Sequence, residues 1–153
     1  MPHPVFLQHR TDAAPHCPNK FGIAPGLHYL YRTQAEKISL LNFKNIAQEE
    51  LALCPGINCL VGDNGAGKTN IIDAVYYLSM CKSSLAMTDG QSVRHGADFF
   101  LAEGQYLTDA GKTESVVCSF SRKGGKVLKR NGKEYERLSD HVGLIPAVIV
   151  SPA

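Results

Sequence analysis

The sequence predicts an α/β fold in which one helix, preceded by a glycine-rich loop, stands on a mixed sheet with antiparallel hairpins. The first observation is the run Gly62–Thr69 (G-D-N-G-A-G-K-T), which fits the pattern G-x-x-x-x-G-K-[ST] of a phosphate-binding loop. The second is the pair of turn signals Gly124-Gly125 and Asn131-Gly132, which separate short runs typical of β-hairpins. A purely parallel fold would alternate strands with helices, so we expect a phosphate-loop (P-loop) NTPase with a mixed sheet.

Each residue type in the loop suits phosphate binding. Glycines let consecutive backbone N–H groups point inward at phosphate oxygens, and the following helix adds its positive N-terminal dipole. Lys68 brings a positive charge, and the Thr69 hydroxyl is a ligand that Mg²⁺ prefers. The loop therefore predicts a bound nucleotide with Mg²⁺, and Thr69 as the metal ligand; ATP as the nucleotide follows from a family resemblance given below. The predicted nucleotide-binding residues are Gly62, Asp63, Asn64, Gly65, Ala66, Gly67, Lys68 and Thr69.

Composition excludes several classes of protein. The chain has 153 residues with 44% apolar and 20% charged residues, which fits one ordinary globular domain. Five cysteines, an odd number without C-x-x-C spacing, argue against a disulfide framework or a zinc site. No apolar run of membrane-spanning length and no secretory leader is visible, so we expect a cytoplasmic protein with no membrane partner.

The chain before the loop divides into two parts. We expect residues 1–35, rich in proline and histidine, to form a disordered extension; a metal site from His3, His9, His16 and Cys17 is disfavoured because the spacing fits no known site. Residues 36–153 then form the domain. Strands are predicted at Lys37–Phe43, Glu49–Leu53 and Ile57–Val61.

After the loop, apolar residues at spacings of three and four predict a helix over Thr69–Met80. A loop with one short helical turn is expected over residues 81–96, and another helical turn over Leu138–Val142. The remaining strands are predicted at Phe99–Tyr106, Ser115–Ser121, Lys126–Arg130, Lys133–Tyr135 and Ile145–Val150.

Basic residues concentrate between positions 122 and 137. Such a cluster could contact DNA phosphates, or it could be a solvated hairpin whose lysines discourage edge-to-edge aggregation. Tyr135 could stack on a base, although a single Tyr at a strand end more often packs. The candidate DNA-binding residues are Arg122, Lys123, Lys126, Lys129, Arg130 and Lys133.

An acidic element for ATP hydrolysis is missing from the sequence. Hydrolysis by such a loop normally needs an apolar strand that ends in Asp or Asp-Glu, and none follows Thr69. Asp73 lies on the predicted helix, where we expect a cap or a surface contact. The catalytic residues are therefore unknown, and we expect the N-terminal part of a longer protein that binds ATP without turning it over.

Several blocks of residues 37–153 resemble the N-terminal lobe of the RecF family, bacterial DNA replication and repair ATPases of the ABC/SMC type. The blocks are Ile38–Ile46, Gly62–Tyr76, Leu78-Ser79 with Lys82-Ser83, Asn131–Lys133, Leu138–Asp140 and Val148–Pro152. Cys81 stands where the family usually has Gly. The family's C-terminal lobes, which hold the signature motif and the acidic strand, have no counterpart here.

The resemblance implies a function. In this family ATP binds between two protomers and promotes a homodimer, which grips single- and double-stranded DNA at gaps and junctions and works with RecO and RecR to load RecA. Lys44 and Asn45 lie in a region that related heads use near the nucleotide, so either could reach ATP or form a simple turn.

Alternative functions remain open. The chain could be a head fragment of another SMC- or Rad50-like or nuclease-linked ATPase, or a stand-alone nucleotide-binding module without catalysis. A GTPase is disfavoured, because the N-K-x-D guanine motif is absent and Asn19-Lys20 precedes the loop.

Overall fold

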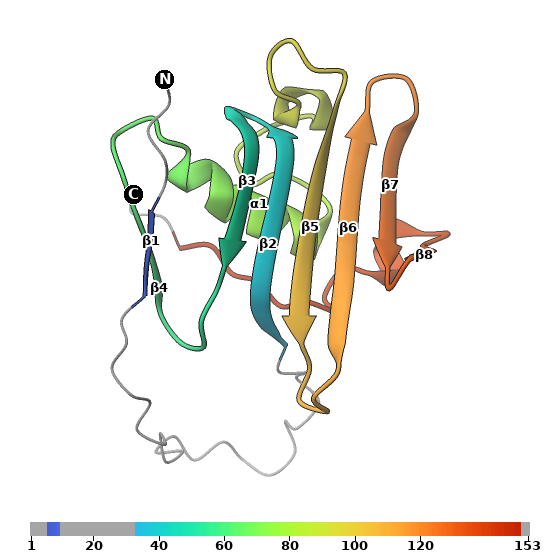
Figure 1. Ribbon diagram of the computed structural model, residues 1–153. Coiled ribbons are helices and arrows are strands. Elements are labelled where there is room, and N and C mark those ends of the chain that lie inside the picture. Colours follow the sequence, from blue (N-terminus) through green and yellow to red (C-terminus); the bar gives the residue numbers. More distant parts are fainter. Residues whose placement is uncertain (1–5, 10–32, 151–153) are drawn as a thin grey trace.

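The computed structural model describes residues 6–9 and 33–150 (Figure 1). The main sheet has six strands in the order β3-β2-β5-β6-β7-β8, and a separate pair joins β1 to β4. All of these pairings are antiparallel. The strands are β1 (Phe6–His9), β2 (Gln34–Phe43), β3 (Ile46–Ala52), β4 (Asn58–Val61), β5 (Phe99–Leu107), β6 (Thr113–Ser121), β7 (Gly125–Arg130) and β8 (Lys133–Glu134). The helices are α1 (Lys68–Met80) and the 3-10 helices η1 (Asp89–Ser92) and η2 (Leu138–Asp140).

The core lies between one face of the sheet and α1, which crosses behind the strands in Figure 1. Alternation along β5 buries Phe100 and Ala102, because successive side chains of a strand point to opposite faces. Phe43, Tyr77 and Phe100 meet edge to face, with ring centroids 5.1–6.0 Å apart. This aromatic cluster fixes α1, and with it the loop that precedes α1, on the sheet.

Both ends of α1 use left-handed backbone. Gly67, with φ 103°, precedes the helix, and Cys81, with φ 55°, ends it by donating its N–H to the Tyr77 carbonyl at 2.8 Å. Glycine is the usual residue at such a C-terminal cap, because it has no Cβ to crowd the backbone. Cys81 therefore occupies a backbone position that suits the family's usual glycine.

The hairpin predictions are confirmed. Strands β6 and β7 pair from Val116↔Arg130 to Ser121↔Gly125, and β8 follows around Asn131-Gly132. Both turn residues have positive φ, 50° and 80°, as a tight hairpin turn requires.

The strand predicted at Ile145–Val150 is wrong, because these residues form no regular element in the structure. A strand needs a neighbour to pair with, and no described strand pairs with this segment; Pro146 also lacks an N–H. Val148 and Val150 are 87% and 90% exposed. An apolar β-branched run alone was therefore an insufficient signal.

Part of the expected N-terminal extension forms regular secondary structure. Phe6–His9 pairs with β4, and β2 already begins at Gln34. Residues 1–5 and 10–32, and the side chains considered for a metal site, lie outside the described part. No helix among the described residues has the length and apolarity to cross a membrane.

Candidate phosphate-binding site

The loop between β4 and α1 has the backbone that the motif predicts. Gly65 and Gly67 both take positive φ, 84° and 103°, and helical residues begin at Lys68. The loop borders a cavity of about 210 Å³. The cavity is lined by Asn45, Asn64, Gly65, Gly67, Lys68, Thr69 and Asn70.

The only charged side chain among the described residues that line this cavity is that of Lys68. The ammonium of Lys68 lies over the loop, where it donates to the carbonyls of Gly62 and Asp63 at 2.7 Å each. The first turn of α1 carries no acidic residue, so no carboxylate of that turn offsets the positive end of the helix dipole. Thr69 is exposed beside Lys68. Together these groups form a site for an anion with several oxygen atoms.

Asn45 lies at the loop, whereas Lys44 turns away from it. Asn45 donates from Nδ2 to the Gly65 carbonyl at 2.8 Å and accepts from Asn70 Nδ2 at 2.7 Å. Lys44 instead places its ammonium 2.6 Å from Asp73. Of the two residues proposed to reach the nucleotide, only Asn45 lines the cavity.

The surface or capping role expected for Asp73 is wrong. Asp73 is fully buried, and its carboxylate accepts from Lys44, from Ser83 Oγ at 2.6 Å and from Ser84 N and Oγ at 2.7 and 2.6 Å. Burial alone would raise the pKa of Asp73, but the hydrogen bonds from Lys44, Ser83 and Ser84 outweigh it and hold that pKa below its usual value. Asp73 is a buried anion that organises structure.

The six candidate DNA-binding residues do not form one surface. Lys126 pairs with Asp89 at 2.9 Å and lies 5.1 Å from the Tyr77 ring centroid, and Arg130 binds Glu114 through two nitrogens. Both point to the face of β7 that carries buried Leu128, because strand side chains alternate. The exposed members are Arg122, Lys123, Lys129 and Lys133.

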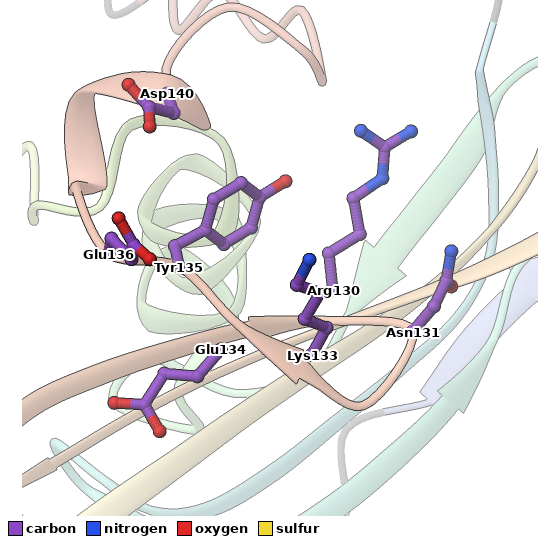
Figure 2. Close-up of a pocket in the computed structure, with 7 residues that line it drawn as sticks. All are labelled: Arg130, Asn131, Lys133, Glu134, Tyr135, Glu136 and Asp140. Atoms are coloured by element: carbon purple, nitrogen blue, oxygen red, sulfur yellow. The ribbon is translucent and has the colours of Figure 1, made fainter.

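A larger cavity of about 600 Å³ lies at the β7–β8 hairpin (Figure 2). In Figure 2, Arg130 and Tyr135 rise from the same side of the hairpin, while Glu134 points away. Tyr135 packs edge to face on His141, with ring centroids 5.4 Å apart, so packing accounts for this tyrosine. Both acidic and basic residues line the cavity, and the guanidinium of Arg130 is paired with the carboxylate of Glu114. Despite its size, we regard it as a weaker phosphate site than the loop. Its lining residues are Arg130, Asn131, Lys133, Glu134, Tyr135, Glu136 and Asp140.

Sequence reasoning missed Asn70, Ser83 and Ser84. Asn70 directly follows the motif and points back to Asn45, and the two serines lie just after α1 and bind Asp73. Only the position of Asn70, beside Thr69, was a usable signal. The serine contacts depend on a loop conformation that local patterns do not reveal.

Comparisons with known proteins agree with this architecture. The family model described as RecF/RecN/SMC N terminal domain matches residues 34–138. The protein "DNA replication and repair protein RecF" of Phocaeicola vulgatus is 54% identical over 118 residues, which cover 77% of this chain and 32% of the relative. Its counterpart in Porphyromonas gingivalis is 48% identical over 117 residues, 76% of this chain and 32% of the relative. The chain thus spans about a third of the length of these curated relatives.

Solved structures of RecF and of SMC ATPases are similar in fold to this chain. The structure described as the recombination mediator protein RecF-ATP in the RecFOR pathway has a TM-score of 0.75 and 27% identity, covering 80% of this chain and 34% of that one. A structure from a study of ATP-driven dimerization of SMC ATPases has a TM-score of 0.65 and 20% identity, covering 72% of this chain and 76% of that one, and supports the fold alone.

Proposed function

Because this chain belongs to the RecF/RecN/SMC N-terminal domain family, we propose that it is the ATP-binding lobe of a RecF-like DNA replication and repair protein. The observation that carries the proposal is the loop itself. Glycines in left-handed backbone, a lysine above the loop and a helix N-terminus with no acidic residue in its first turn surround one cavity. The similar RecF structure that was solved with ATP gives the nucleotide class.

The roles of the site residues follow from their chemistry. Backbone N–H groups of residues 62–69 would donate to the phosphates, and the Lys68 ammonium would exchange its bonds to the Gly62 and Asp63 carbonyls for phosphate oxygens. The Thr69 hydroxyl, exposed beside Lys68, would hold Mg²⁺, which neutralises phosphate charge.

We propose that this chain binds ATP without hydrolysing it. Asp73, the acidic residue of α1, is buried and held by Lys44, Ser83 and Ser84, so it does not face the cavity. In the described part of the chain, no acidic residue is among those that line the cavity.

The partners belong to the whole protein. We propose that the complete protein forms an ATP-dependent homodimer in the cytoplasm, binds single- and double-stranded DNA, and works with RecO, RecR and RecA. The exposed side chains of Arg122, Lys123, Lys129 and Lys133 are the candidate phosphate contacts on this lobe.

Calorimetric titration with ATP and Mg²⁺ tests the proposed function. Wild-type protein should bind, and Lys68→Ala should lose binding because the phosphate charge loses its partner. The control is Lys112→Ala, which removes the same charge from an exposed lysine of the β5–β6 turn. This turn lies near the start of β2, whereas Asn45 and the loop lie near its end, so the variant should bind like wild type. Equal affinity of wild type and Lys68→Ala would show that the loop is not the binding site.

A further inference from the structure

Asn45 joins two parts of the phosphate site with one side chain. Its Nδ2 donates to the carbonyl of Gly65 in the middle of the loop, at 2.8 Å. Its Oδ1 accepts from Asn70 Nδ2 on the first turn of α1, at 2.7 Å. The side-chain amide therefore spans from the loop to the beginning of the helix, although Asn45 belongs to the turn between β2 and β3.

The loop backbone fits closely against the same turn. A Cβ built on Gly67 would lie 3.1 Å from Asn45 Oδ1 and 3.3 Å from Ile46 Cγ1. Both distances are shorter than ordinary van der Waals contact, so the turn and the loop touch at Gly67. Glycine is needed here for space as well as for its φ of 103°.

The turn that carries Asn45 is itself anchored on both sides. Lys44 has left-handed backbone with φ 52°, donates its N–H to the Ser92 carbonyl at 2.8 Å, and forms the ion pair with buried Asp73. Ile46, on the other side, is buried in the core. Asn45 is exposed between two fixed neighbours, so its amide is presented to the loop from a rigid support.

We propose that Asn45 is a positioning residue that sets the shape of the phosphate loop through the Gly65 carbonyl, rather than a ligand of the nucleotide. In a planar trans peptide, fixing the direction of one carbonyl fixes the plane of the whole peptide unit. Holding Gly65 therefore restricts how the following amides can be presented to phosphate oxygens. This inference rests on the proposed function of the loop.

Hydrogen–deuterium exchange of the free protein tests the positioning role separately from nucleotide binding. Asn45→Ala removes both hydrogen bonds, and Asn45→Asp keeps the acceptor for Asn70 but cannot donate to Gly65. Both variants should exchange the amides of residues 62–70 faster than wild type. The matched control is Asn131→Ala, which removes an amide that accepts from Ser115 N at 2.9 Å at the far end of the sheet. It should leave exchange in the loop unchanged.

The same variants are titrated with a fluorescent ATP analogue and Mg²⁺. Asn45→Ala should bind about tenfold more weakly, as expected for a loop that must be ordered on binding. Asn45→Asp should bind more weakly still, because its carboxylate also repels the phosphates. Unchanged exchange in the loop of Asn45→Ala overturns the positioning role, and lost affinity with unchanged exchange identifies Asn45 as a direct ligand instead. If wild type binds no nucleotide, the proposed function fails, while the exchange result still decides the positioning role.

Discussion

The ammonium of Lys44 lies 2.6 Å from the carboxylate of Asp73, and this ion pair joins the β2–β3 turn to the helix that begins at the phosphate loop. The carboxylate is fully buried and the Lys44 side chain is only 12% exposed. Two serines complete the hydrogen bonding of the carboxylate. A buried charge is tolerated only when it is paired and hydrogen-bonded, and this one is.

Removing one partner of this ion pair should strongly destabilise the folded protein. We expect Asp73→Ala to lower the free energy of unfolding by about 3–5 kcal/mol, because it leaves the Lys44 ammonium without its counter-charge. The control is Glu50→Ala, which breaks the exposed pair between Lys37 and Glu50, 2.8 Å long with side chains 34% and 65% exposed, and should cost less than about 1 kcal/mol. Urea denaturation measures both. Similar losses for the two variants would contradict the account.

His141 should make stability depend on pH. It is buried, its Nε2 lies 2.7 Å from the Leu78 carbonyl, and burial, with a smaller effect of nearby Arg130, lowers its pKa below the ordinary 6.5. The unfolded chain therefore binds a proton more readily, and stability falls as pH decreases below 6.5. Above that pH the contribution is complete, because both states are neutral.

The variant His141→Gln tests this pH dependence, because its amide can still donate to the Leu78 carbonyl but does not titrate. Denaturation midpoints should be measured between pH 5 and pH 7.5. We expect the wild-type midpoint to fall on acidification and the midpoint of the variant to fall less. Parallel curves would mean that His141 is not the group responsible.

Two lysines on β7 should differ in their effect on stability. Lys126 pairs with Asp89 and donates to the Cys81 carbonyl, whereas Lys129 is exposed on the other face. We expect Lys126→Ala to cost about 1.5–3 kcal/mol, the range for hydrogen bonds to charged groups. Lys129→Ala should change stability by less than about 0.5 kcal/mol. Thermal denaturation compares them, and a reversed order would refute the assigned orientation of β7.

Gly104 should not tolerate a side chain. It lies on the buried face of β5, and a Cβ there would be 2.6 Å from Tyr106 Cζ. Gly104→Ala would push the buried Tyr106 ring out of place, at a cost of about 1–3 kcal/mol. Gly111→Ala is the comparison. Gly111 has a positive φ of 71° but open space around it, so an added Cβ there would strain the backbone without a steric clash. A thermal midpoint for Gly104→Ala equal to wild type would show that the ring moves freely.

Local sequence patterns were sufficient for the loop, for α1 and for the hairpins. The motif fixes the residue type at the first and the last three positions of Gly62–Thr69. Asn131-Gly132 demands positive φ at both residues. These features depend on neighbours in the chain, so sequence alone predicts them.

Features that depend on distant partners were not predictable in the same way. The burial of Asp73 depends on Lys44 from another element, and no strand in the described part of the chain pairs with Ile145–Val150. The sequence could partly predict that the basic residues divide between two faces of β7, because period-two alternation places Lys126 and Arg130 on the same face as Leu128. Their partners, Asp89 and Glu114, were visible only in the structure.

The most direct test of the central claim is to locate the bound nucleotide. Amide chemical shifts of isotopically labelled protein should be recorded by NMR during titration with ATP and Mg²⁺. We predict that the largest changes fall on residues 62–70 and on Asn45, which border the 210 Å³ cavity. Changes centred on the β7–β8 hairpin around Arg130 and Tyr135, with the loop unaffected, would contradict the assignment of the phosphate site.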